Sequence, residues 1–185
     1  MRTILLFIFL GLSLAVKAIE PAPEADEARQ LVKQFAGELK GRLVAGMKAG
    51  GPVNAIGVCN IEAPGIAAKL SSDSGWRVAR TSLKLRNADN EPDAWEKKVL
   101  EQFEADHRAG KDPKTLEYSG TVSQNGKNSY RYMKAIPTGE VCIACHGSHL
   151  AEETRNKLSE LYPDDMATGF SVGELRGAFS LEKDL

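Results

Sequence analysis

The segment LEYSGTVSQNGKNSYRYMKAI, residues 116–136, has the pattern of two β-strands joined by a tight turn. Leu116–Ser123 and Ser129–Ile136 flank the residues Gln124-Asn125-Gly126-Lys127. Asn-Gly readily adopts the positive φ angles that a tight hairpin turn requires. The segment therefore predicts an antiparallel β-hairpin.

The sequence before this hairpin predicts two helices and a further strand. Residues 24–49 place apolar side chains at helical spacing and contain no proline, which predicts a long amphipathic helix ended by Gly50-Gly51-Pro52. Residues 53–68 follow as a short segment, with a second break expected at Pro64-Gly65. Residues 76–85 alternate in polarity as a strand does, and Pro92 begins a helix that ends at Gly110.

The sequence after the hairpin predicts a helix over residues 151–161 and a last hairpin over residues 167–185, with Gly173-Glu174 at its turn. Neighbouring strands joined by short turns, with helices between them, are typical of an α+β fold around an antiparallel sheet.

The N-terminus has the features of a secretory signal peptide. Arg2 precedes an apolar run from Ile4 to Val16, and Val16-Lys17-Ala18 provides small residues for cleavage after Ala18. We therefore expect a signal peptide over residues 1–18 and a single domain over residues 19–185, located in the periplasm. An uncleaved membrane anchor is the alternative.

Composition and charge exclude several classes of function. Without Arg2 and Lys17 the chain has 22 basic and 25 acidic residues, a net charge of about −3. No block of five like charges is present, so we expect no nucleic-acid partner. No carboxylate pair, activated nucleophile or phosphate-binding loop stands out, so we do not expect an enzyme.

The sequence Cys142-Ile143-Ala144-Cys145-His146 is a Cys-x-x-Cys-His motif, which is typical of c-type haem attachment. We expect one covalent haem c, bound through Cys142 and Cys145, with His146 as an iron ligand. One alternative is a Cys142–Cys145 disulfide or thioredoxin-like redox pair. Another is a zinc site that adds His149 and either Cys59 or His107.

Cys59 is left without an internal partner if the other two cysteines form thioethers. Its apolar surroundings favour an inert, buried thiol, which is the common state of a free cysteine. Other candidates for the second iron ligand are Met47, Met133, Met166, His107 and His149. Four basic side chains are candidates to neutralise haem propionates, although a solvated strand face explains them equally well: Arg80, Lys84, Arg86 and Arg131.

Several motifs resemble a family of exported c-type haem domains with a PAS-like fold, found alone or as the input domain of membrane-bound sensors. The similar segments are Val58-Cys59-Asn60, residues 80–87, 90–96 and 130–134, Cys142–Gly147, and residues 162–169 and 173–178. The resemblance implies a PAS-like antiparallel sheet and an iron held by His146 and Cys59. Ala88 departs from the family pattern, where proline is expected.

Two functions follow from this resemblance. A Cys59 thiolate favours ferric iron and lowers the reduction potential relative to a His/Met cytochrome, which suits an electron carrier with a redox partner still to be identified. Alternatively, loss of Cys59 or binding of CO or NO makes the domain a sensor. We expect electron transfer or redox chemistry, because no output domain follows the haem segment and a sensor therefore needs a separate receptor.

Overall fold

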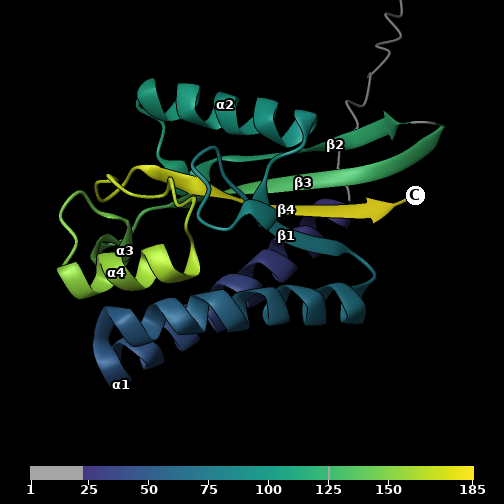
Figure 1. Cartoon of the computed structure of the whole chain (residues 1–185). Coiled ribbons are helices and arrows are strands. Elements are labelled where there is room, and N and C mark those ends of the chain that lie inside the picture. Colours follow the sequence, from purple (N-terminus) through teal and green to yellow (C-terminus); the bar gives the residue numbers. More distant parts are fainter. Residues whose placement is uncertain (1–22, 125) are drawn as a thin grey trace, which may run out of the picture.

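The computed structural model describes residues 23–124 and 126–185. Its centre is a four-stranded antiparallel sheet in the order β1-β4-β3-β2. Helix α1 (Pro23–Ser74) covers one face of the sheet and helix α2 (Ala94–Arg108) covers the other, as Figure 1 shows. The predicted α+β fold with a long N-terminal helix is confirmed.

The strands are β1 (Arg77–Thr81), β2 (Glu117–Gln124), β3 (Lys127–Pro137) and β4 (Leu175–Asp184). The short elements are α3 (Ile143–His146), α4 (Glu152–Leu161) and the 3-10 turns η1 (Ala88–Asn90), η2 (Pro113–Thr115) and η3 (Glu140–Cys142). The predicted helix over residues 151–161 corresponds to α4.

The hairpin predicted over residues 116–136 is confirmed as β2 and β3. The two strands pair from Glu117 opposite Lys134 to Gln124 opposite Lys127. Gly126 has a φ of +76°, a conformation that glycine adopts at little steric cost. Strand β4 pairs with β3 on one side and β1 on the other, so the C-terminal strand lies inside the sheet.

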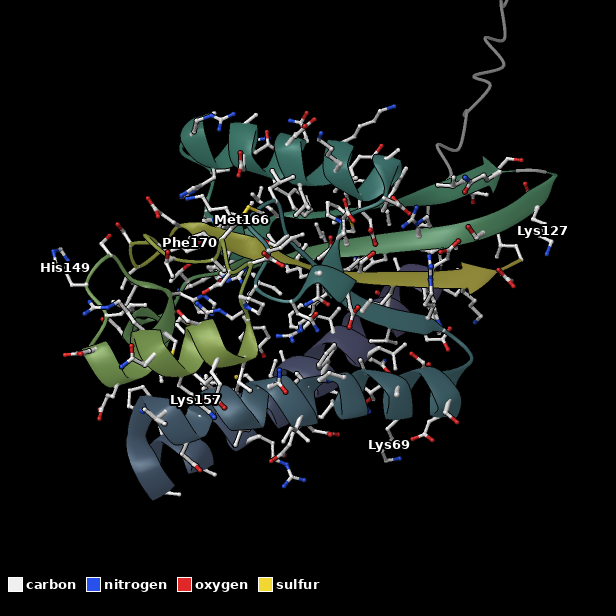
Figure 2. The ribbon with its side chains drawn as sticks, in the orientation of Figure 1. Lys69, Lys127, His149, Lys157, Met166 and Phe170 are labelled. Atoms are coloured by element: carbon white, nitrogen blue, oxygen red, sulfur yellow. The ribbon has the colours of Figure 1, made fainter. Side chains whose placement is uncertain are left out.

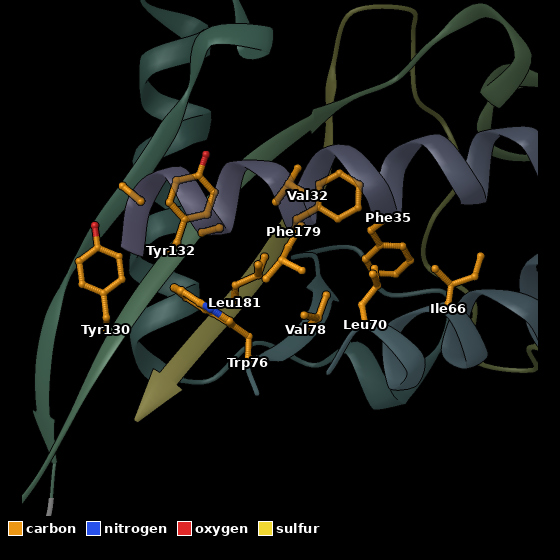
Figure 3. Packing of buried hydrophobic residues seen from close by; sticks show 13 residues of the cluster. Val32, Phe35, Ile66, Leu70, Trp76, Val78, Tyr130, Tyr132, Phe179 and Leu181 are labelled. Carbon is orange, nitrogen blue, oxygen red and sulfur yellow. The ribbon is translucent and has the colours of Figure 1, made fainter. Parts of the chain in front are cut away.

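Side chains of β3 alternate between two separate cores. Tyr130 and Tyr132 belong to the core under α1, where Phe35 packs against Phe179 of β4 with ring centroids 5.3 Å apart (Figure 3). Met133 and Ala135 instead belong to a core with apolar side chains of α2. Even-numbered residues of this part of β3 therefore face α1, and odd-numbered residues face α2.

Helix α1 consists of two helical halves joined by a kink at Gly50-Gly51, where the sequence predicts a helix end. Gly51 has a φ of +66°, which favours glycine. The second half continues to Ser74, so the expected break at Pro64-Gly65 is wrong. Burial of one continuous face, which includes Ile66 and Leu70, offsets the cost of about 3 kcal/mol for an internal proline.

Helix α2 confirms the helix predicted between Pro92 and Gly110. A capping box fixes its start, because Asp93 accepts hydrogen bonds from the Trp95 and Glu96 amides and the Glu96 carboxylate accepts one from the Asp93 amide. Val99, Leu100 and Phe103 form its buried face.

Two predicted strands differ from the structure. The strand expected over residues 76–85 ends at Thr81, because the Ser82 hydroxyl donates to the Lys84 and Arg176 carbonyls and the chain leaves the sheet. The prediction of a hairpin over residues 167–185 is also wrong, because only β4 forms a strand there. Both edges of β4 are already paired, and residues 167–172 form a loop instead.

The signal peptide expected over residues 1–18 lies outside the described residues. Within residues 23–124 and 126–185, no helix has the length and apolar character needed to cross a membrane.

Candidate functional site

A cavity of about 420 Å³ lies on the α1 side of the sheet. Its walls come from both halves of α1, from β1 and the segment that follows it, and from residues 141–146. Phe35, Leu39, Ile56 and Ile136 contribute apolar surface. The volume falls within the ~300–1,000 Å³ that is usual for cofactor and small-molecule sites.

All three cysteines of the chain and His146 line this cavity. The Cys-x-x-Cys-His motif forms a single tight turn, made of η3 and α3, which presents two thiols and an imidazole from one short segment. Each cysteine is a free thiol, so the structure contradicts a Cys142–Cys145 disulfide. No three His, Cys, Asp or Glu side chains in the described part of the chain are placed to hold a metal ion, which argues against the zinc alternative.

The His146 ring is oriented by the backbone of a following loop. Its Nδ1 lies 2.7 Å from the Ala167 carbonyl oxygen, which only accepts, so Nδ1 carries the proton and Nε2 keeps its lone pair. Arg176 Nε also lies 3.2 Å from Nδ1 and cannot donate to that protonated nitrogen. Arg86 Nη1 lies 3.4 Å from Nε2. Burial, and then the charges of Arg176 and Arg86, lower the pKa of His146 to about 2.

Arg86 and Asp165 form a buried ion pair beside the motif. Arg86 donates to both oxygens of Asp165, at 3.2 and 3.0 Å, and to the carbonyls of Cys145 and Ala167, at 2.6 and 3.1 Å. Side-chain exposure is 11% for Arg86 and 10% for Asp165. One guanidinium therefore joins the motif to the loop that orients His146.

The loop between α4 and β4 packs directly on the motif. The Phe170 amide donates to the His146 carbonyl at 2.9 Å, and the Gly169 amide donates to the Gly147 carbonyl at 3.2 Å. The Phe170 ring lies edge-on to the His146 ring, with centroids 6.2 Å apart. Figure 2 shows Phe170 and Met166 on this loop. Residues expected to form a strand thus support the site.

Cys59 reaches the cavity from the second half of α1. Burial raises the pKa of its thiol, while the nearby charges of Arg80 and Arg86 act in the opposite direction. Burial also raises the pKa of the Cys145 thiol. The Cys59 and Cys145 thiols are therefore harder to ionise than an ordinary cysteine, although the cationic Arg86 side chain lies near both.

None of the other candidates for a second iron ligand lines the cavity. Met133 is fully buried in the core under α2, and Met166 is 55% exposed. His149 projects from the surface in Figure 2. His107 lies in the last turn of α2, and Met47 lies on α1 without facing the cavity.

The basic residues expected at the site separate into two groups. Arg80 and Arg86 line the cavity. Arg131 does not, so its predicted role there is corrected: it faces α2, where it pairs with Asp93 at 2.7 Å and Glu96 at 3.3 Å. An odd-numbered residue of β3 cannot reach the α1 side.

Lys84 is exposed outside the cavity, with its Nζ 5.0 Å from the centroid of the Phe170 ring.

Arg176 is a cavity residue that the sequence analysis did not identify. It lies at the start of β4 and reaches the cavity beside Ser82, whose hydroxyl accepts from its Nη1 at 3.0 Å. Burial, and then the charges of Arg86 and Arg80, lower the pKa of Arg176 to about 10. Burial also lowers the pKa of Arg80. No spacing in the sequence relates Arg176 to the motif.

Comparisons with known proteins show the family of the chain and a similar fold. The family model for Tll0287-like proteins matches residues 15–183. A crystal structure described as the cyanobacterial haem-protein Tll0287 is similar, with 26% sequence identity and a TM-score of 0.63 over 87% of this chain and 95% of that one. No curated protein matches. The chain belongs to the Tll0287-like family.

Proposed function

We propose that this chain is a c-type haem protein that carries one haem, joined to Cys142 and Cys145 and ligated by His146 and Cys59. The observation that carries the proposal is that these four side chains line one largely apolar cavity together with three arginines. Family membership and the similar solved structure, described as a haem-protein, support it.

The donor set fits covalent attachment. Each thiol adds across a vinyl group, with sulfur bonding to one carbon and hydrogen to the other, so that attachment needs no oxidant. Cys142 and Cys145 are both free for this addition and lie within one turn. The cavity walls are apolar enough to exclude water from a flat macrocycle.

The two residues that would hold the iron come from different elements. His146 is held by its Nδ1–H bond to the Ala167 carbonyl, which leaves Nε2 available to a metal. Cys59 comes from α1 and has no cysteine partner. A Cys59 thiolate would balance the positive charge of ferric iron and lower the reduction potential relative to a methionine ligand.

We propose electron transfer or redox chemistry, rather than enzymatic catalysis, as the role of the protein. When bound, the haem supplies a one-electron couple. The buried Arg86–Asp165 pair and the Phe170 contact fix the motif, which limits rearrangement around His146 during that change of charge. The expected signal peptide supports a periplasmic location, where a redox partner protein would exchange electrons with the haem.

A sensor is the second candidate, and the kink of α1 favours it. Cys59 lies on the half of α1 that follows Gly50-Gly51. Release of a Cys59 ligand, or its replacement by CO or NO, would free this half to move about the glycine pair and alter a contact with a receptor protein.

The proposed function is tested by spectroscopy of the full chain matured with haem. A covalent haem survives denaturing electrophoresis, and a Cys142→Ala/Cys145→Ala variant should lose it. The ferric Soret band should change in Cys59→Ala and Cys59→Met but not in Met166→Leu, which alters an exposed side chain. An unchanged band without Cys59 would exclude the thiolate ligand. CO binding on reduction would favour the sensor, whereas an unreactive six-coordinate ferrous form would favour electron transfer.

A further inference from the structure

We propose that Arg80 and Arg176 bind the two carboxylates of the ligand, so that the cavity selects a tetrapyrrole with two free propionate groups. This inference rests on the proposed haem function and deepens it, because it assigns the residues that recognise one part of the ligand. Of the three arginines that line the cavity, Arg86 alone forms an ion pair with a carboxylate among the described residues.

Arg80 lies on β1 and lines the cavity without a counterion. Among the described residues, the ionisable neighbours that affect the pKa of its guanidinium are the Cys59 thiol and the Tyr162 phenol, not a carboxylate. An aromatic ring takes that place: the centre of the guanidinium lies 5.6 Å from the centroid of the Phe35 ring. Such a contact fixes the plane of the group and leaves its N–H donors free.

Arg176 has the same character on another wall of the cavity. Its Nη1 donates to the Ser82 hydroxyl at 3.0 Å and to the Lys84 carbonyl at 3.2 Å, and its guanidinium stacks over the Phe170 ring at 5.4 Å. These partners are neutral. Within residues 23–124 and 126–185, no carboxylate forms an ion pair with Arg176.

The other basic residues near the site are already neutralised or solvated. Both oxygens of Asp165 accept from Arg86. Arg131 is paired on the opposite face of the sheet. Lys84 is exposed. Asp89 is the acidic residue among those that line the cavity, and it is exposed, so that water solvates its charge.

Two half-buried guanidinium groups without a carboxylate partner are costly, because the cavity walls remove part of the water that would otherwise solvate their charge. A carboxylate restores that interaction and matches the planar fork of arginine. The cavity provides two guanidinium groups without a carboxylate partner, those of Arg80 and Arg176, and haem carries two propionates. The number and the charge of the two kinds of group therefore match.

The test compares haem with haem dimethyl ester, whose carboxylates are uncharged. Reversible binding is measured by absorbance titration of the full chain carrying Cys142→Ala/Cys145→Ala, which retains His146 and Cys59. We expect this parent to bind haem more tightly than the ester. Arg80→Leu and Arg176→Leu should each reduce the preference roughly tenfold to a hundredfold, the effect expected for one charged hydrogen-bonded pair, and the double replacement should abolish it.

The controls separate recognition from folding. Arg77→Leu removes an exposed cation outside the cavity and should leave the preference unchanged. Arg176→Lys keeps the charge and should retain part of the preference. Equal affinity of the parent for haem and its ester, or a preference that survives both leucine replacements, would overturn the inference while leaving the haem function intact. Failure of the parent to bind either compound would contradict the proposed function as well.

Discussion

Replacing Asp165 with asparagine should strongly destabilise the protein, because it leaves the buried charge of Arg86 without a counterion. The Arg86 and Asp165 side chains are only 11% and 10% exposed, so water does little to screen the change. Removing one partner of a buried pair typically costs about 3–5 kcal/mol. A domain with a total stability of about 5–15 kcal/mol would lose a large share of it.

The measurement is urea unfolding followed by circular dichroism, with all variants in the same haem state. Glu104→Gln is the matched control, because it breaks an ion pair with Arg108 whose side chains are 41% and 70% exposed. Such exposed pairs contribute about 0–1 kcal/mol.

A double variant, Arg86→Met/Asp165→Leu, removes both charges together. We expect it to be more stable than Asp165→Asn alone, since no buried charge is left unpaired. A loss below about 1 kcal/mol for Asp165→Asn, similar to the Glu104→Gln control, would refute the reasoning.

Three further predictions concern residues away from the thiols. Gly177→Ala should cost at least about 1 kcal/mol in urea unfolding, because Gly177 has a φ of +154° and a Cβ would lie 2.4 Å from the Thr81 carbonyl oxygen. Arg131→Met should destabilise by about 3–5 kcal/mol while the haem spectrum stays unchanged; a shifted Soret band would contradict its placement under α2. The hydrogen bond from Arg29 lowers the pKa of Glu117 in the folded protein, so its contribution to stability is complete above the ordinary glutamate value of about 4.3 and is lost as pH falls through the lower folded value. Stability of Glu117→Gln should therefore depend less on pH in this acidic range, and an unchanged dependence would argue against the pair.

The sequence by itself determined those elements that depend only on a few neighbouring residues. Gly126 with its flanking strands defines the hairpin, and Asp93 with Glu96 defines the start of α2. The Cys-x-x-Cys-His motif places two thiols and an imidazole on one short segment. These features need only short-range geometry, which the order of residues specifies directly.

The tertiary structure decided everything that depends on partners far apart in the chain. Residues 167–172 became a loop because β4 already pairs with β1 and β3, so a local alternating pattern had no free edge to join. Pro64 stayed within a helix because burial of the surrounding face outweighed a local preference.

Contacts between segments far apart in the chain also decide on which side of the sheet each arginine lies. Sequence alone treated Arg80 and Arg131 alike, whereas the pleat of the sheet sends one to the cavity and the other to α2. Arg176 and Cys59 reach the cavity only because β4 and α1 pack beside β1. The motif is evident from the sequence, but the position of Cys59 in the cavity and the charges around it were set by packing.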